Sequence, residues 1–179
     1  NTKNRKIILY QGAVNMGRGL ELIIETMAFI DNALLIIIGD GDLLQSLKTR
    51  VTEGKRDNNI IFIGKIKPKK LQQLTPLAHL GLSLEEDLGL NYRYALPNKI
   101  FDYIQAEIPI LVSNLPEMSR VVEEYGVGEI VRNRSPKSLA KQIETILKKN
   151  YAQKLKEAKE IFIWEKQEAK LLHFFKNLK

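Results

Sequence analysis

The chain has 179 residues, 44% hydrophobic and 27% charged, which is typical of a folded domain and excludes a disordered protein. It has no cysteine, so disulfide bonds and thiolate metal sites are excluded, and its two histidines, His79 and His173, are too far apart to suggest a metal site. The net charge of +7 would suit nucleic acid, but the lysines are spread over helices rather than gathered among aromatic residues, so nucleic acid is not the expected partner.

The chain begins with a strand, a glycine-rich loop and a helix. Residues 7–10 form a continuous apolar run, as in a strand covered on both faces. The loop at 12–19 has Gly12 and Gly17 at P-loop spacing, but Arg18 and Gly19 stand where that motif needs Lys and a hydroxyl. Without the hydroxyl there is no magnesium ligand, so we reject a P-loop NTPase. A helix follows, with apolar residues at 3–4 spacing from Leu20 to Ile30.

The second strand, residues 34–38, ends at Gly39-Asp40-Gly41. A dinucleotide-binding fingerprint needs a further glycine where Leu44 stands, which weakens an NAD-type interpretation. Taken alone, the two glycines indicate only a turn. A helix is expected from an N-cap at Asp42 to Gly54.

Two more strands are expected at residues 60–63 and 80–84, with a helix over 68–77 between them. Lys65 and Ile66 follow the first of these strands, at the carboxyl end where doubly wound sheets bind ligands. His79, just before the second strand, is interpreted as a structural residue. The acidic run 85–87 then opens a loop that reaches Leu96.

The segment from Pro97 has the chemistry of an anion-binding helix start. Pro97 suits a first helical turn, and Asn98 is a good N-cap residue. Lys99 adds positive charge where free amides and the helix dipole already favour a phosphate. Asp102 lies one turn further on the same face. We therefore expect the amides to bind a diphosphate and the carboxylate of Asp102 to bind ribose hydroxyls.

The rest of the chain continues the alternation of helices and strands. A strand is expected at 110–113, a helix at 116–125, a strand at 129–131 and a helix that Ser135 and Pro136 begin. The terminal segment, 151–179, is expected to be helical, with an apolar stripe made of Ile161, Trp164, Leu171, Leu172, Phe175 and Leu178. This stripe either packs on its own domain or crosses to another one.

Six apolar strands interleaved with helices predict an α/β fold, a Rossmann-like doubly wound parallel sheet with helices on both faces, over residues 1–179 as one domain. Because the glycine-rich and charged loops all follow strands, they meet at the carboxyl edge of this sheet. That convergence predicts one ligand site.

The segment 97–113, Pro-Asn-Lys-Ile-Phe-Asp-Tyr through Glu-Ile-Pro-Ile-Leu-Val-Ser, resembles the Pro-x-Lys-x-x-Glu-Tyr…Gly-x-Pro-Val segment of retaining GT-B glycosyltransferases of the family 4 type. In that family it belongs to the C-terminal, donor-binding half. The resemblance covers nearly the whole chain, and the chain has no initial Met, so we expect the second half of a two-domain enzyme.

The resemblance assigns roles to further residues. Arg18 corresponds to a cation that touches the donor diphosphate, beside Gly12, whereas Ala13 replaces a second cation of the family. Gly39 and Asp40 correspond to a Gly-x-Gly turn beside the donor, and the backbone at Lys65 and Ile66 to the contact with the nucleobase. We expect Arg93 or Lys99 to supply the cation lost at Ala13.

Three departures from the family pattern stand out. Asp102 replaces the usual Glu, Glu107 replaces a Gly at a turn where Gly avoids a Cβ penalty, and the usual Glu-x7-Glu spacing is absent.

The function that the resemblance implies is transfer of a sugar from a nucleotide diphosphate to an acceptor, in polysaccharide biosynthesis. Arg18, Lys99 and the helix amides would stabilise the departing diphosphate, so no metal is expected. No apolar run approaches the roughly 18 residues of a membrane span, and an intracellular location is expected. The basic surface also suits an anionic membrane or a lipid-linked acceptor.

Two other functions stay open. One is a sugar-nucleotide epimerase of the same fold, for which Glu85, Glu86 and Asp87 offer the acid/base candidates. The other is a non-catalytic module that binds a nucleotide or a protein, which the charge missing at Ala13 favours.

Overall fold

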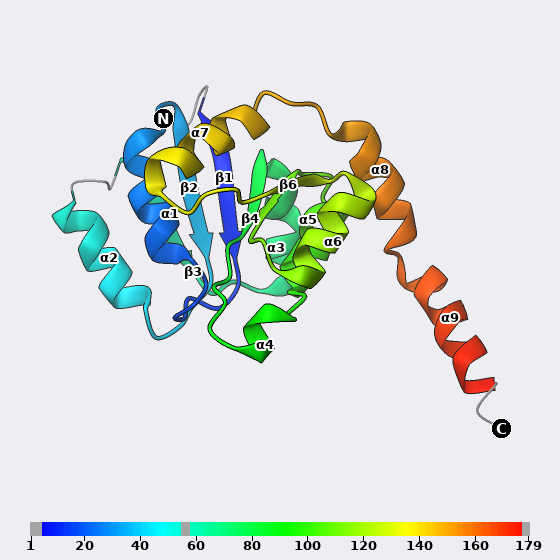
Figure 1. The fold of residues 1–179 in the computed structure, drawn as a ribbon. Helices are drawn as coiled ribbons and strands as arrows, with labels where there is room; N and C mark the ends of the chain where they lie inside the picture. Colours follow the sequence, from blue (N-terminus) through cyan, green and yellow to red (C-terminus); the bar gives the residue numbers. More distant parts are fainter. Residues whose placement is uncertain (1–4, 55–57, 177–179) are drawn as a thin grey trace.

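The computed structural model describes residues 5–54 and 58–176, in which six parallel strands form one sheet (Figure 1). The strands are β1 (Lys6–Gln11), β2 (Ala33–Ile38), β3 (Ile60–Gly64), β4 (Leu80–Ser83), β5 (Ile110–Val112) and β6 (Gly128–Ile130). Their spatial order is β3-β2-β1-β4-β5-β6. This confirms the predicted Rossmann-like fold, and each strand lies within one residue of its predicted bounds.

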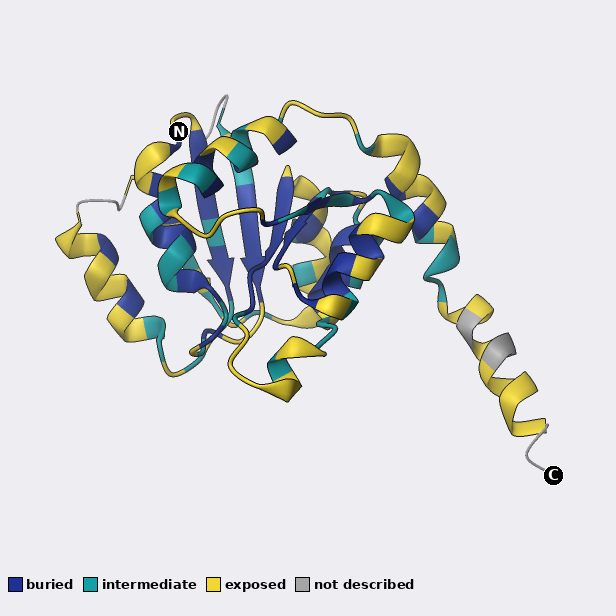
Figure 2. Cartoon of the chain, in the orientation of Figure 1, coloured by how far each residue is buried: buried dark blue, intermediate teal, exposed yellow. Residues whose placement is uncertain are grey.

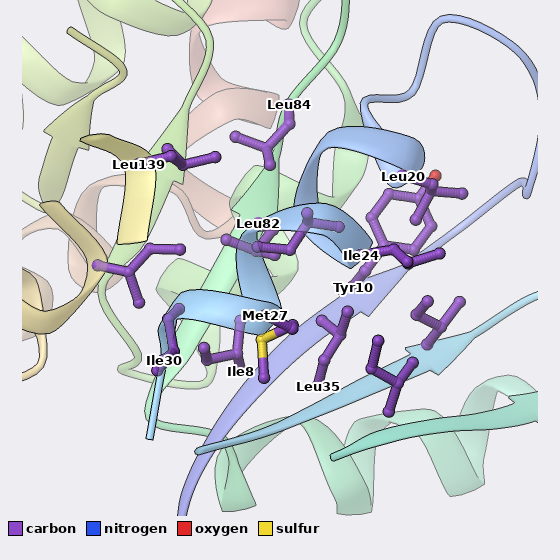
Figure 3. Close-up of a cluster of buried hydrophobic side chains, with 14 of the residues drawn as sticks. Ile8, Tyr10, Leu20, Ile24, Met27, Ile30, Leu35, Leu82, Leu84 and Leu139 are labelled. Atoms are coloured by element: carbon purple, nitrogen blue, oxygen red, sulfur yellow. The ribbon is translucent and has the colours of Figure 1, made fainter. Parts of the chain in front are cut away.

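Helices cover both faces of the sheet. They are α1 (Leu20–Thr26), α2 (Leu44–Glu53), α3 (Pro68–Leu74), α4 (Leu90–Arg93), α5 (Asn98–Gln105), α6 (Pro116–Tyr125), α7 (Pro136–Ile146), α8 (Ala152–Ile161) and α9 (Trp164–Lys176), with 3-10 turns η1 (Met27–Phe29) and η2 (Thr75–Leu77). One apolar core joins the sheet to α1, α2 and α7, and a second joins it to α3, α5, α6 and α8. Period-two alternation along β1 explains the division: Ile8 and Tyr10 face the first core (Figure 3), and Leu9 faces the second.

The sheet opens where β1 and β4 meet, because these strands pair only through Ile8 with Leu80 and Leu9 with Gly81. The fully buried Tyr103 of α5 lies over this point. Its hydroxyl accepts a hydrogen bond from the backbone amide of Gln11 at 3.1 Å. The same hydroxyl lies 3.3 Å from the carbonyl oxygens of Leu9 and Leu82. A Cβ on Gly81 would lie 2.5 Å from the Tyr103 ring, so glycine gives the ring its space. Tyr103 thus satisfies backbone groups that strand pairing leaves free.

Two predicted helix caps are wrong. Pro97, with φ −67° and ψ 136°, occupies the N-cap position of α5, and Asn98 is the first helical residue and makes no capping bond. Pro97 already has the backbone conformation of an N-cap residue, because its ring fixes φ and its ψ is extended. Asn98 therefore becomes the first residue of the helix. The second helix, α2, begins after Leu43 rather than Asp42. There the backbone of residues 42 and 43 bonds to Asn15 and Val14, which delays the helix start.

The turn after α5 carries the strain expected from the sequence. Glu107 has φ 57°, a left-handed conformation that costs a residue with a Cβ about 1–2 kcal/mol. Its carboxylate accepts a hydrogen bond from Lys159 of α8 at 2.6 Å, and this exposed ion pair offsets part of the strain.

The chain leaves the body of the domain after α8. Phe162 stacks edge-on against Phe101 and Tyr125, with ring centroids 5.0 and 4.8 Å apart, and α8 packs on α5 and α6. Beyond this anchor, α9 projects outward (Figures 1 and 2), and its described apolar side chains are exposed, from Trp164 to Phe175. From Trp164 onward the described part of the terminal stripe does not pack on its own domain, whereas Ile161 is half-buried and Leu178 lies outside the described residues. In residues 5–54 and 58–176 we find no helix with the length and apolar character to cross a membrane.

Replacement of Tyr103 by Phe tests the role of its hydroxyl. We expect the free energy of unfolding to fall by about 1–3 kcal/mol, because the substitution leaves the buried Gln11 amide without a partner. Urea denaturation followed by circular dichroism measures the change. Tyr94→Phe, at an exposed tyrosine, is the control; equal stability of Tyr103→Phe and the wild type would contradict this role.

Candidate functional site

The carboxyl ends of β1, β2 and β3 open into three adjoining cavities. The first, of 270 Å³, is lined by Gln11, Gly12, Ala13, Arg18, Leu71, Pro97, Asn98, Lys99 and Asp102. The second, of 460 Å³, is lined by Gly12, Ala13, Ile38, Gly39, Asp40, Gly41, Lys65, Ile66 and Leu71. The third, of 470 Å³, shares Gln11, Leu71 and Asp102 with the first. Apart from Arg93, every site residue predicted from the sequence therefore lines this connected groove.

The helix start that the sequence singled out is tied to the loop after β4 by an ion pair. Lys99 Nζ donates a hydrogen bond to Glu85 Oε1 at 2.8 Å, and Ser83 Oγ donates to Glu85 Oε2 at 2.7 Å. The Glu85 side chain has no exposed surface and that of Lys99 is 9% exposed. The ammonium also lies 4.3 Å from the centroid of the Tyr10 ring. Burial lowers the pKa of Lys99, and the pairing with Glu85 opposes that effect.

Arg18 approaches the same carboxylate oxygen as Lys99. Its Nη1 is 3.6 Å from Glu85 Oε1, and its guanidinium carbon lies 5.7 Å from the centroid of the Tyr92 ring. Its side chain is 30% exposed and faces the 270 Å³ cavity. Two cations thus share one buried carboxylate oxygen beside the first cavity. Cations that line a cavity attract an anion such as phosphate.

Asp102 faces the same cavity from one turn further along α5. Gln11 Nε2 donates a hydrogen bond to Asp102 Oδ2 at 2.9 Å. Partial burial raises the pKa of Asp102, and the bond from Gln11 opposes that rise. The two cations and the carboxylate are therefore neighbours along one groove, as the sequence predicts.

Arg93 takes a different position from the one expected. It lies on α4 and forms a bidentate pair with Asp87, with Nε and Nη2 at 3.0 and 2.8 Å from Oδ2. It lines none of the three cavities. The short link between the two residues lets Asp87 bind the guanidinium locally, so Arg93 does not replace the charge missing at Ala13 in this structure.

Several residues of the site were not identified from the sequence. Arg134, which follows β6, donates hydrogen bonds to Ser113 Oγ at 3.0 Å and to the Leu84 carbonyl at 3.1 Å, and so holds the backbone that leads to Glu85. Gln11 bonds to Asp102, and Thr75 bonds to Gln11. The one available signal was Gln11, a polar residue that ends an otherwise apolar strand.

His79 lies away from the groove, where its Nδ1 accepts a hydrogen bond from the Ile7 amide at 3.1 Å. Burial lowers the pKa of His79, and the charge of Lys6 lowers it further. This contact agrees with a structural role. Across the described parts of the chain, no three His, Cys, Asp or Glu side chains gather as a metal site would require.

Comparison with known proteins places these features in a family. The family model described as "Glycosyl transferases group 1" matches residues 1–162. A curated relative, "Probable glycosyltransferase WbjE" of Pseudomonas aeruginosa, is 26% identical over 149 residues, which are 80% of this chain and 36% of that protein.

Solved structures give the same result for the fold. Sucrose-phosphate synthase (tll1590) from Thermosynechococcus elongatus matches with a TM-score of 0.79 and 18% identity, over 98% of this chain and 46% of that one. Anabaena Alr3699/HepE, solved in complex with UDP and glucose, matches with a TM-score of 0.73 and 16% identity, over 90% of this chain and 44% of that one. The chain thus spans less than half the length of these proteins.

Replacement of Lys99 by Ala tests the buried ion pair. We expect the free energy of unfolding to fall by about 3–5 kcal/mol, because the substitution leaves the buried Glu85 carboxylate with only the more distant Arg18 as a counter-charge. Arg93→Ala, which breaks an exposed ion pair with Asp87, is the matched control and should change stability little. Chemical denaturation compares the two; equal effects would show that burial does not strengthen the Lys99 pair.

Replacement of Gly39 by Ala tests how closely the loop after β2 approaches the loop after β1. It has φ 155°, and a Cβ at this position would collide with the carbonyl oxygen of Gly12. We expect Gly39→Ala to destabilise the fold by more than the about 1–2 kcal/mol that left-handed strain alone costs. Gly89→Ala is the control, since Gly89 also has a positive φ, 143°, but nothing within 4 Å of the added methyl. The midpoint temperatures of thermal unfolding of the two variants measure the difference. Equal midpoints for Gly39→Ala and Gly89→Ala would contradict a collision at Gly39.

Proposed function

The chain belongs to the glycosyl transferases group 1 family, and we propose that it is the donor-binding half of a glycosyltransferase that transfers a sugar from a nucleotide diphosphate to an acceptor. The observation that carries this proposal is the groove itself, in which a helix start, two cations and a carboxylate follow one another.

The first cavity is the place proposed for the diphosphate. No side chain caps the start of α5, where the Ile100 amide bonds to the Pro97 carbonyl and the amides before it are left for a ligand. The helix dipole adds partial positive charge there. Arg18 and Lys99 line the same cavity, and both approach the buried Glu85 carboxylate. The two cations lie near the helix start and Asp102 lies one turn further along α5, so the diphosphate is proposed to bind at the cation end of the cavity.

The nucleoside is proposed to follow the groove away from the diphosphate. Asp102 would accept hydrogen bonds from ribose hydroxyls, and the base would lie near the backbone of Lys65 and Ile66 in the second cavity. HepE, whose structure this chain matches in part, was solved in complex with UDP and glucose, which supports a nucleotide as the ligand. Contacts through the backbone do not choose between uracil and guanine.

The proposed chemistry is transfer with retained stereochemistry. As the bond between the anomeric carbon and the diphosphate oxygen breaks, negative charge grows on the leaving diphosphate. Arg18, Lys99 and the α5 amides would stabilise that charge, and fixed donors do so without the cost of reorganising water. Protein cations would thereby do the work that a metal does elsewhere, so we expect no metal requirement.

The acceptor is proposed to bind on a further domain, because the chain spans 36% of WbjE and 46% of the synthase. The 179 residues alone are then expected to bind a nucleotide and not to transfer sugar. The exposed apolar side chains of α9 would suit contact with that domain. A lipid-linked acceptor at an anionic membrane surface, in polysaccharide biosynthesis, is the class of acceptor that the basic charge favours.

The geometry does not favour the epimerase alternative. Of its acid/base candidates, Glu85 is buried in an ion pair, Glu86 lies 3.8 Å from Arg134, and Asp87 is paired with Arg93. A non-catalytic nucleotide-binding module keeps one supporting observation, since Ala13 brings no charge into the groove.

Titration with UDP-sugars and GDP-sugars by calorimetry tests the proposal. We expect one of the two series to bind and Asp102→Ala to weaken it by about tenfold or more, because a hydrogen bond to a carboxylate is lost. Asp31→Ala, at the opposite edge of the sheet, is the matched control. Unchanged affinity in both Lys99→Ala and Asp102→Ala would show that the site assignment is wrong. An assay of transfer and hydrolysis by the full two-domain enzyme separates an enzyme from a binding module.

A further inference from the structure

The last residue of β1 carries a buried amide that bridges two other elements. Gln11 is 2% exposed and Thr75, in η2, is 3% exposed. Gln11 Nε2 donates a hydrogen bond to Asp102 Oδ2 at 2.9 Å, and Gln11 Oε1 accepts one from Thr75 Oγ1, also at 2.9 Å. The side chain lies where the first and third cavities join.

The chemistry of the two partners fixes the orientation of the Gln11 amide. An ionised carboxylate only accepts hydrogen bonds, so the NH₂ group must face Asp102. The carbonyl then faces Thr75, whose single hydroxyl proton can be donated to Gln11 Oε1 or to the Leu71 carbonyl, both 2.9 Å away. The reverse orientation would bring the carbonyl oxygen against the carboxylate, and two acceptors repel each other. Gln11 therefore holds Asp102 in its charged form better than in its protonated form.

The hydrogen bond from Gln11 makes the two oxygens of the Asp102 carboxylate differ. Oδ2 is bound to the amide, whereas no described residue donates a hydrogen bond to Oδ1. Asp102 is exposed on α5, and without this bond its short side chain would be free to rotate. With the bond, one oxygen is fixed and the other stays available to a ligand in the cavity that Asp102 lines.

We propose that Gln11 is a positioning residue that holds the Asp102 carboxylate for the ribose hydroxyls of the nucleotide, and that it thereby sets discrimination between ribonucleotides and deoxyribonucleotides. This inference rests on the proposed function. It assigns Gln11 no contact with the reacting atoms; Gln11 acts through the position and the charge of Asp102.

Gln11 is the neutral residue that donates a hydrogen bond to the Asp102 carboxylate. The other charged side chains that line the first and third cavities are Arg18, from the loop after β1, and Lys99, from α5 itself. Both are engaged with Glu85, and α3 and η2 contribute only neutral lining residues. Loss of the Gln11 bond therefore leaves partial burial to raise the pKa of Asp102 further.

Gln11→Met, which keeps the length of the side chain and removes its hydrogen bonds, tests the inference. The probes are UDP, 2′-deoxy-UDP and 3′-deoxy-UDP, or the guanosine series if that one binds. We expect ribonucleotide affinity to fall about tenfold, since a charge-assisted network is lost, and affinity for the more weakly bound deoxy analogue to stay nearly unchanged. The ribose-to-deoxy ratio measured by calorimetry should collapse toward one.

Gln142→Met is the matched control, because Gln142 Nε2 also donates a hydrogen bond to a carboxylate, that of Glu129 at 3.2 Å, beside β6 and away from the groove. It should leave the ratio unchanged. Thr75→Val keeps Gln11 and removes the hydroxyl that holds its carbonyl, so it should lower the ratio in the same direction by a smaller factor. That variant tests the inference if Gln11→Met does not fold.

The pH dependence of nucleotide affinity is a second measurement, and it would not change if Gln11 had only a structural role. A protonated Asp102 loses acceptor capacity, so affinity should fall as the pH drops through its pKa, and in Gln11→Met the fall should begin at a higher pH than in the wild type. The comparison of two proteins with one nucleotide cancels the titration of the phosphate. A ratio and a pH profile equal to those of the wild type, or an equal loss for all three nucleotides, overturns the inference. Failure of the wild type to bind any nucleotide overturns the proposed function instead.

Discussion

A buried carboxylate between two cations holds the site together. Glu85 is enclosed at the carboxyl end of β4, and charge without a partner in such a place is costly, so Lys99 of α5 and Arg18 of the loop after β1 are held around it. Three segments distant in sequence are thereby fixed relative to one another. The same arrangement keeps two cations beside the cavity, so the interaction that orders the loops also places groups that can bind an anion.

The helix α5 connects this arrangement to the sheet. Its inner face contributes Tyr103, whose hydroxyl bonds to the Gln11 amide at the point where β1 and β4 stop pairing, and Gly81 gives the ring its space. Its outer face presents Asp102 to the groove. Because these side chains come from consecutive positions of one helix, the packing that seals the sheet also sets where the carboxylate lies.

The groove and the C-terminal end of the chain differ in how firmly they are held. The strand ends are close-packed, to the extent that Gly39 leaves no room for a methyl group beside Gly12. By contrast, α9 carries exposed aromatic side chains beyond the anchor that Phe162 forms on α5 and α6. The preorganised part is the part proposed to bind the nucleotide, and the open apolar part is the part proposed to meet another domain.

The sequence alone determined the six strands, their parallel arrangement and the edge at which the loops converge, because apolar periodicity shows which faces of a segment are buried. It also located Lys99 and Asp102, since Pro97 and the residue types around it restrict the local backbone. The strained turn at Glu107 was expected from the resemblance to a family that has Gly at that position. Only the tertiary structure decided the partners. Glu85 binds Lys99, Gln11 binds Asp102, and Arg93 is taken by Asp87 rather than by the groove. Apolar periodicity indicates which side chains are buried. The partner of a charged or polar group depends on which groups the fold brings within about 3 Å. Those groups come from segments far apart in the chain, so periodicity does not predict them.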